Sequence, residues 1–180
     1  MLKQFQQDAI LLSLAEELLA NGSWTGETHL QKATYFLQEL ARVPLGFTFI
    51  LYKYGPFSFD LRDELTGMQA NLLLSLKPQM PYGPSLVPGE LSGTFKSAYE
   101  KTISRYRDEV QFIAKWLGGK GVAELERLST ALMVTLADAE LCGSDQAGRL
   151  RELKPHVSSQ DADAAINEVC NMRRNWRAVA

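Results

Sequence analysis

Apolar residues recur every three or four positions along most of this chain, and this spacing restricts it to a largely helical fold. The first such stretch covers residues 3–20 and stops at Asn21-Gly22, a pair suited to a left-handed helix end. The second begins near residue 26 and ends before Pro44. A helical projection of this second stretch places Gln31, Lys32 and Tyr35 on its polar face.

One run of different character interrupts the helical pattern. Residues 47–54 are aromatic and β-branched and predict a strand that Gly55-Pro56 ends. Ser58 can cap a third helix that reaches about residue 68. Residues 72–76 predict a short strand, and the proline-rich residues 77–93 predict an exposed hairpin or loop. This order of elements is typical of an elaborated winged helix.

The rest of the chain is expected to be helical. Residues 99–117 predict one long amphipathic helix, and a glycine-rich break follows at 118–121. Further helices are expected at 125–139, at 145–153 and from Ser158, which with Asp161 forms a partial capping box. We therefore expect a mostly α fold with a small β component (α+β). A winged-helix-like part (1–95) would pack with a helical part (96–180) as one continuous unit.

Charge and cysteine usage narrow the class of function. The chain has 19 basic and 21 acidic residues, a formal net charge of −2, so nucleic acid is disfavoured as a partner. Its two cysteines, Cys142 and Cys170, lie outside any C-x-x-C pattern, which suits a reducing compartment. The first eight residues are polar, and no apolar run approaches the length of a membrane span. We expect a cytoplasmic protein that does not enter a membrane.

Residues that could support catalysis or metal binding are few. The two histidines, His29 and His156, have no further ligand at helical spacing, so we expect no metal site and no cofactor. Cys142 and His156 could pair as a nucleophile and base, but no flanking motif supports the pair. The glycine-rich segment 118–121 lacks the spacing of a phosphate-binding loop. We therefore expect that the protein is not an enzyme.

The third predicted helix carries a cluster of carboxylates. Asp60, Asp63 and Glu64 accompany a single cation, Arg62. The cluster is either an acid–base site or, as we favour, a solvated helix face. In a winged helix this element normally enters the major groove, where three carboxylates would repel the phosphates.

Aromatic residues gather around the turn that precedes this helix. Tyr52, Tyr54, Phe57 and Phe59 fall there, and Tyr35 lies on the polar face of the second helix. Aromatic side chains are common anchors of protein interfaces. They are equally common as cover for a neighbouring helix, and the sequence leaves both interpretations open.

Two motifs resemble a known bacterial family. Leu30-Gln31-Lys32 with Tyr35-Phe36-Leu37, followed by Tyr52-Lys53-Tyr54-Gly55-Pro56, is similar to the uncharacterised YwgA-like family. The L-Q-K-x-x-Y-F and Y-G-P pair also resembles the SocA/Panacea-type antitoxin domain. The likeness is clearest over residues 26–68, and segments 124–131 and 153–155 resemble the tail of the YwgA-like family. The motif pair also has a structural interpretation, in which Gln31 and Lys32 brace the helix against the Gly55-Pro56 turn.

The resemblance implies a protein that binds another protein directly, as an antitoxin binds its toxin. We expect a non-enzymatic interaction module, antitoxin-like or a subunit of a bacterial defence system. The alternative is a winged-helix DNA-binding transcription regulator. A homodimer is left open. The candidate partner-binding residues are Gln31, Lys32, Tyr35, Tyr52, Tyr54, Gly55, Pro56, Asp60, Asp63 and Glu64.

Overall fold

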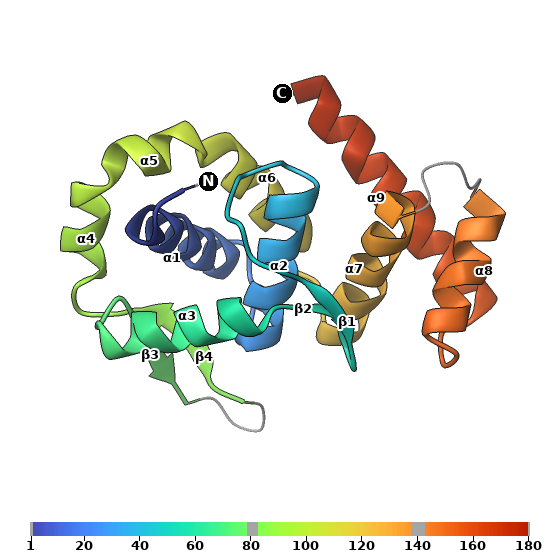
Figure 1. Ribbon diagram of the computed structural model, residues 1–180, viewed down its shortest axis with the longest axis horizontal. Helices are drawn as coiled ribbons and strands as arrows, with labels where there is room; N and C mark the ends of the chain where they lie inside the picture. The colour runs from blue at the N-terminus through green and yellow to red at the C-terminus, as the bar shows by residue number, and fades with distance from the viewer. Residues whose placement is uncertain (1, 79–82, 138–142, 180) are drawn as a thin grey trace. The chain divides into compact units, whose positions relative to one another are not determined.

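The computed structural model describes residues 2–78, 83–137 and 143–179 (Figure 1). These residues are mostly helical and include two antiparallel strand pairs, which confirms the expected α+β class. The chain forms two compact units. The first comprises Met1–Ile50 and Phe57–Lys120, and the second comprises Leu51–Pro56 and Gly121–Ala180.

The first unit is built around α1 (Gln4–Ala20), which is buried along most of its length. It contacts α2 (Glu27–Glu39), α4 (Ser92–Ala98), α5 (Glu100–Arg105) and α6 (Arg107–Leu117). Figure 1 shows α4, α5 and α6 curving around α1. The sequence suggested a boundary between two parts at residue 95. Because α4, α5 and α6 pack on α1, they belong instead to the first unit, with the N-terminal helices.

A short hairpin covers another side of the first unit. Strand β3 (Leu74–Lys77) pairs antiparallel with β4 (Ser85–Pro88), with Leu74 opposite Pro88 and Lys77 opposite Ser85. The backbone N–H of Leu86 donates to the carbonyl of Thr25 at 2.9 Å, which ties β4 to the segment between α1 and α2. A strand therefore forms close to the expected residues 72–76, and a hairpin follows as expected over 77–93, of which residues 79–82 lie outside the described residues. The hairpin is not exposed throughout, because Ser85 and Leu86 are buried.

The single long helix expected over residues 99–117 is wrong. The helix breaks at Tyr99 and Tyr106, where φ is −114° and ψ is near 20°. Tyr99 packs against Phe95 with ring centroids 4.8 Å apart, and Tyr106 is 9% exposed. The breaks let three short helices follow α1, and α5 and α6 bury Ile103, Val110 and Ile113 among their apolar positions.

The strand expected over residues 47–54 is also wrong in extent. Only β1 (Ile50–Tyr52) forms, and it pairs with β2 (Gly55–Phe57). Gly55-Pro56 thus begins a second strand instead of ending the first. The Gln38 side chain occupies both backbone groups of Phe47, accepting from its N–H and donating to its carbonyl at 2.9 Å each. The N–H and carbonyl of Phe47 are therefore not available to pair with a neighbouring strand.

The third helix begins where the sequence indicates. Helix α3 (Phe59–Ala70) is capped by Ser58, whose hydroxyl accepts from the Leu61 N–H at 3.2 Å. Its buried residues are Leu61, Leu65 and Met68, one apolar stripe at helical spacing.

In its described residues, the second unit contains three helices and the residues of the β1–β2 turn. Helices α7 (Val122–Ala137) and α8 (Gly143–Leu153) both pack on α9 (Ser159–Val179). The Ser158 hydroxyl accepts from the Asp161 N–H at 3.0 Å, so the partial capping box is confirmed. Among the helices in the described ranges, none combines the length and apolarity that crossing a bilayer requires.

Candidate partner-binding surface

The turn between β1 and β2 presents a group of large side chains to solvent. Leu51 is 38% exposed, Tyr52 53% and Tyr54 55%, and Lys53 between the tyrosines is exposed as well. The Lys53 ammonium lies 5.4 Å from the centre of the Tyr54 ring. We call Leu51, Tyr52, Lys53 and Tyr54 the hairpin surface. Adjacent exposed apolar side chains of this kind are typical of a contact surface.

The base of the hairpin is held closely against α7. Gly55 is buried and has a φ of +83°, a conformation that favours glycine. A Cβ atom there would lie 3.1 Å from Thr130 Oγ1 and 3.2 Å from Ser129 Oγ. The absence of a side chain is therefore what lets the hairpin approach this helix.

A buried ion pair holds the other side of the turn. The Lys154 ammonium donates to the carbonyl oxygen of Lys53 at 2.6 Å and to Glu126 Oε1 at 2.7 Å. Lys154 is 5% exposed, and the Glu126 side chain is 11% exposed. The exposed His156 has its Nε2 3.9 Å from the same carboxylate oxygen. Glu126 and Lys154 are 28 residues apart in the sequence, and their spacing alone gave no sign that they meet.

The three candidates on α2 are not at the surface. Gln31 is 0% exposed, Lys32 1% and Tyr35 4%, so the expectation that they form a polar outer face is wrong. Gln31 braces α2 against the start of α3: its amide donates to the Ser58 carbonyl at 2.9 Å and accepts from the Ser58 N–H at 3.0 Å. A helical projection treats polar residues as outward, whereas this one satisfies backbone groups from within.

Tyr35 is packed among aromatic neighbours in the first unit. Its ring makes an edge contact with Phe49 at 5.0 Å between centroids. Burial, with a smaller contribution from the nearby Glu39, raises the pKa of the Tyr35 phenol above its ordinary value. Tyr35 therefore acts as a core residue in this structure.

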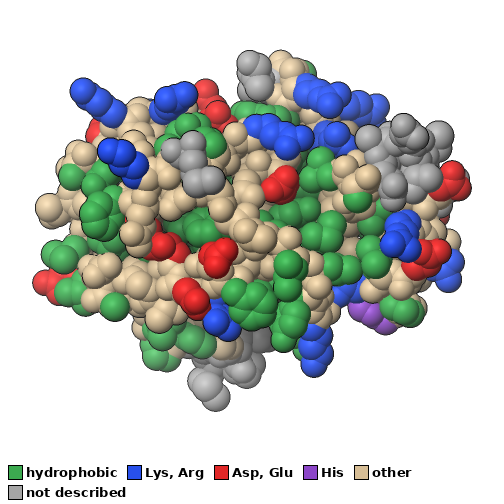
Figure 2. Space-filling model, in the orientation of Figure 1, with side chains coloured by type: hydrophobic (Ala, Val, Ile, Leu, Met, Phe, Trp, Pro, Cys, Tyr) green, Lys and Arg blue, Asp and Glu red, His purple; other side chains and the backbone are tan. Residues whose placement is uncertain are grey.

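The acidic candidates on α3 remain accessible. Asp60 and Asp63 are exposed, and Glu64 is half-buried. The single cation of the group, Arg62, forms an ion pair with Asp63 at 3.0 Å and lies over the Phe59 ring at 5.1 Å. Several acidic side chains gather over α3 in Figure 2. Because Arg62 is engaged by its own neighbour, α3 presents negative charge to a ligand.

A carboxyl pair between α1 and α3 was not foreseen. Asp8 is 2% exposed and is hydrogen-bonded to Glu64, which also accepts from Gln4 Nε2 at 3.2 Å. Burial first, and then Glu64, raise the pKa of Asp8 to about 8. An acidic residue directly before the apolar stretch Ala9-Ile10-Leu11-Leu12 is the sequence signal that could have revealed it.

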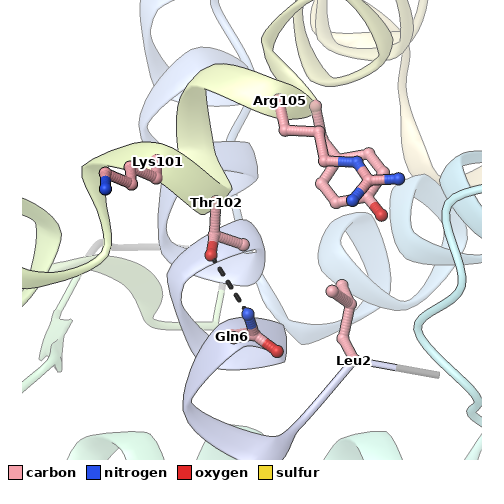
Figure 3. Close-up of a pocket in the computed structure, with 6 residues that line it drawn as sticks. Leu2, Gln6, Lys101, Thr102 and Arg105 are labelled. Carbon is pink, nitrogen blue, oxygen red and sulfur yellow. Dashed lines mark hydrogen bonds between the residues drawn. The ribbon is translucent and has the colours of Figure 1, made fainter.

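A small pocket beside the N-terminal end of α1 offers two cations that do not converge. Its volume is about 220 Å³. Figure 3 shows the Lys101 and Arg105 side chains directed to opposite sides, with Thr102 bonded to Gln6 at 3.4 Å between them. The remaining lining residues are Leu2 and Tyr106. The arrangement does not focus charge on one ligand atom.

The residues considered for catalysis do not form a constellation in the described part of the chain. His29 is buried and lies 3.3 Å from the Lys120 carbonyl oxygen, and burial lowers its pKa. Cys142 lies outside the described residues, and Cys170 is a half-buried thiol on α9. Residues 2–78, 83–137 and 143–179 contain no group of three or more His, Cys, Asp or Glu placed to hold a metal ion. No protein-family model matches the chain, and no curated protein sequence is significantly similar to it.

Proposed function

We propose that this chain is a non-enzymatic, antitoxin-like interaction module that binds a partner protein through the hairpin surface. The observation that carries the proposal is the exposure of all three residues of β1, which are Ile50, Leu51 and Tyr52, together with exposed Tyr54 just beyond. Burying an apolar side chain fully on binding contributes about 1.5–3 kcal/mol. These four side chains are 38–55% exposed and can form the centre of an interface.

The acidic face of α3 supports a polypeptide partner over a nucleic acid. Asp60 and Asp63 are exposed, and Arg62 is paired within the same helix. Nucleic-acid binding requires uncompensated cations that displace counterions from phosphates. The resemblance of the L-Q-K-x-x-Y-F and Y-G-P pair to SocA/Panacea-type domains supports the same class of partner. We propose a toxin or a subunit of a bacterial defence complex.

The test is affinity capture from the cells that normally make the protein. Tagged wild-type chain is compared with the double variant Tyr52→Ser/Tyr54→Ser, and recovered proteins are quantified by mass spectrometry. We expect a protein that is enriched on the wild type and reduced about tenfold or more on the variant.

A matched control removes exposed apolar side chains elsewhere. Leu76 and Leu91 are 54% and 46% exposed and belong to the first unit. The variant Leu76→Ser/Leu91→Ser should recover the partner as the wild type does. Equal recovery on the tyrosine variant and the wild type, or a wild type that elutes alone, would contradict the proposal.

A second candidate function is DNA binding as a winged-helix regulator. The observation that favours it is the succession of α1, a segment bonded to β4 through Thr25, α2, α3 and the β3–β4 hairpin. This order is typical of winged helices, in which the third helix reads the major groove. The acidic character of α3 is the argument against it.

A mobility-shift assay on DNA from the protein's own promoter region separates the two candidates. Under our proposal the chain does not shift this DNA even at low salt. A shift that weakens steeply as salt rises, and that is lost in Arg62→Ala, would favour the regulator instead.

A further inference from the structure

We infer that Lys154 is a positioning residue for the hairpin surface: its buried ammonium fixes the turn that presents Tyr52 and Tyr54. The inference rests on the proposed function for the identity of what the hairpin binds. The fixing of the turn itself stands on contacts within the second unit.

The Lys154 ammonium joins a charge to a turn carbonyl. It donates to Glu126 Oε1 at 2.7 Å and to the Lys53 carbonyl oxygen at 2.6 Å, distances of strong charge-assisted hydrogen bonds. Removing the turn from this ammonium would leave a buried donor without that acceptor, which is costly in a water-poor site. The ion pair therefore favours one position of the Lys53 carbonyl.

The same turn also packs closely against α7. Gly55 lies so close to Thr130 and Ser129 that an added Cβ would stand 3.1–3.2 Å from their hydroxyl oxygens. The backbone is thus tied at Lys53 and closely packed at Gly55. Tyr54, between these two points, is 55% exposed. The exposed Tyr54 is therefore positioned by the contacts of its two chain neighbours, Lys53 and Gly55.

A hairpin this small depends on such support. Each strand has three residues, and an isolated two-stranded ribbon is at best marginally stable in water. Binding through a mobile turn loses free energy because the turn must be ordered on contact, whereas a fixed turn has been ordered in advance. Lys154 therefore affects affinity without lying at the interface.

Limited trypsin digestion measures directly how often the turn opens. Trypsin cleaves after lysine, and the Lys53–Tyr54 peptide carbonyl is the group that Lys154 holds. In Lys154→Met we expect cleavage at this bond to become roughly ten- to hundredfold faster, because proteolysis follows the population of the opened turn. Arg149→Met, which removes an exposed cation from α8, should cleave like the wild type.

Internal sites distinguish a loosened turn from an unfolded protein. Cleavage after Arg62 in α3 and Arg174 in α9 should keep its wild-type rate in Lys154→Met. If cleavage after Arg174 rises in parallel, Lys154→Met has lost its fold. Glu126→Gln then replaces it in the test, because this change removes the charge partner of Lys154 with little change in side-chain size. Unchanged cleavage after Lys53 in a folded variant overturns the inference.

Partner capture then tests the positioning role. Lys154→Met should recover several-fold less of the partner than the wild type, and Lys154→Arg, which keeps the charge and the donors, should restore much of the loss. A freed turn with undiminished recovery overturns the positioning role. If Tyr52→Ser/Tyr54→Ser leaves recovery unchanged while Lys154→Met frees the turn, the proposed function fails and the fixing of the turn stands.

Discussion

The carboxyl groups of Asp8 and Glu64 are hydrogen-bonded to each other, although the two residues belong to different helices, α1 and α3. Such a bond requires a proton on one of the two groups. The other oxygen of Asp8, Oδ1, is buried and finds no hydrogen-bond partner among the described residues. An ionised Asp8 is therefore doubly disfavoured, by desolvation and by the second carboxylate, and its pKa rises to about 8.

Replacing Asp8 by asparagine should stabilise the protein at neutral and alkaline pH. The folded chain holds the Asp8 proton up to about pH 8, whereas the unfolded chain releases it near pH 4. The free energy of unfolding therefore falls as pH rises through this window. Asp8→Asn removes this loss and should gain about 1–3 kcal/mol at pH 8, with almost no gain at pH 4.

Urea denaturation at pH 4, 6 and 8 measures this gain. Asp163→Asn, a change to an exposed carboxylate on α9, serves as the control and should show no such growth with pH. A gain from Asp8→Asn that is the same at all three pH values would contradict a titrating Asp8.

His29 should give the opposite dependence on pH. Burial lowers its pKa, so below pH 6.5 the unfolded chain takes up a proton that the folded chain resists. The stability associated with neutral His29 is present above pH 6.5 and is lost as the pH falls below it. When the pH is lowered from 7.5 to 5, the free energy of unfolding of His29→Gln should fall by about 1 kcal/mol less than that of the wild type. Urea denaturation at both pH values measures this difference. A fall in the free energy of unfolding that is the same for His29→Gln and the wild type would contradict this dependence.

Gly55→Ala should destabilise the second unit through crowding as well as backbone strain. A methyl group there meets Thr130 Oγ1 at 3.1 Å, and the φ of +83° disfavours alanine, so we expect a loss of about 2–3 kcal/mol. Gly22 has nearly the same φ, +84°, but open space around it. Gly22→Ala should therefore cost only about 1 kcal/mol. Equal thermal destabilisation of the two variants would remove the argument from close packing.

Gln31→Leu should cost more stability than Gln38→Leu. Both amides hold the N–H and the carbonyl of one distant residue, Ser58 for Gln31 and Phe47 for Gln38. Gln31 and Ser58 are fully buried, whereas Gln38 is half-buried. Orphaning two buried backbone groups should cost about 2–4 kcal/mol, and the Gln38 change about 1 kcal/mol. Chemical denaturation of both variants provides the comparison.

Local signals in the sequence predicted several elements well. The first helix, the Ser58 cap and the Ser158–Asp161 box follow from residues that act over one turn, and all three are present. The break of the 99–117 helix was not predictable in this way. Tyr99 and Tyr106 keep the apolar spacing of a continuous helix, while the bends depend on packing around α1.

The candidate site was predicted in part for a similar reason. Tyr52 and Tyr54 are exposed as an interface requires, but five other candidates are buried: Gln31, Lys32, Tyr35, Gly55 and Pro56. Helical projection assigns polar side chains to the outside unless a distant partner is known. The motif pair did suggest that Gln31 braces its helix near the Gly55-Pro56 turn, and its amide bonds to Ser58, 27 residues away. The bond from Lys154 to Lys53 spans 101 residues, and no pattern in the sequence indicated it.

The separation of Lys53 from Lys154 also has a consequence for synthesis. Ribosomes add about 5–20 residues per second, so Lys154 is polymerised roughly 5–20 seconds after Lys53. Through most of that interval the nascent turn lacks both the Lys154 ammonium and a complete α7, which ends at Ala137. A chaperone that meets the chain on the ribosome would therefore encounter a loose ribbon, and the fixed turn would form only after residue 154 has been added.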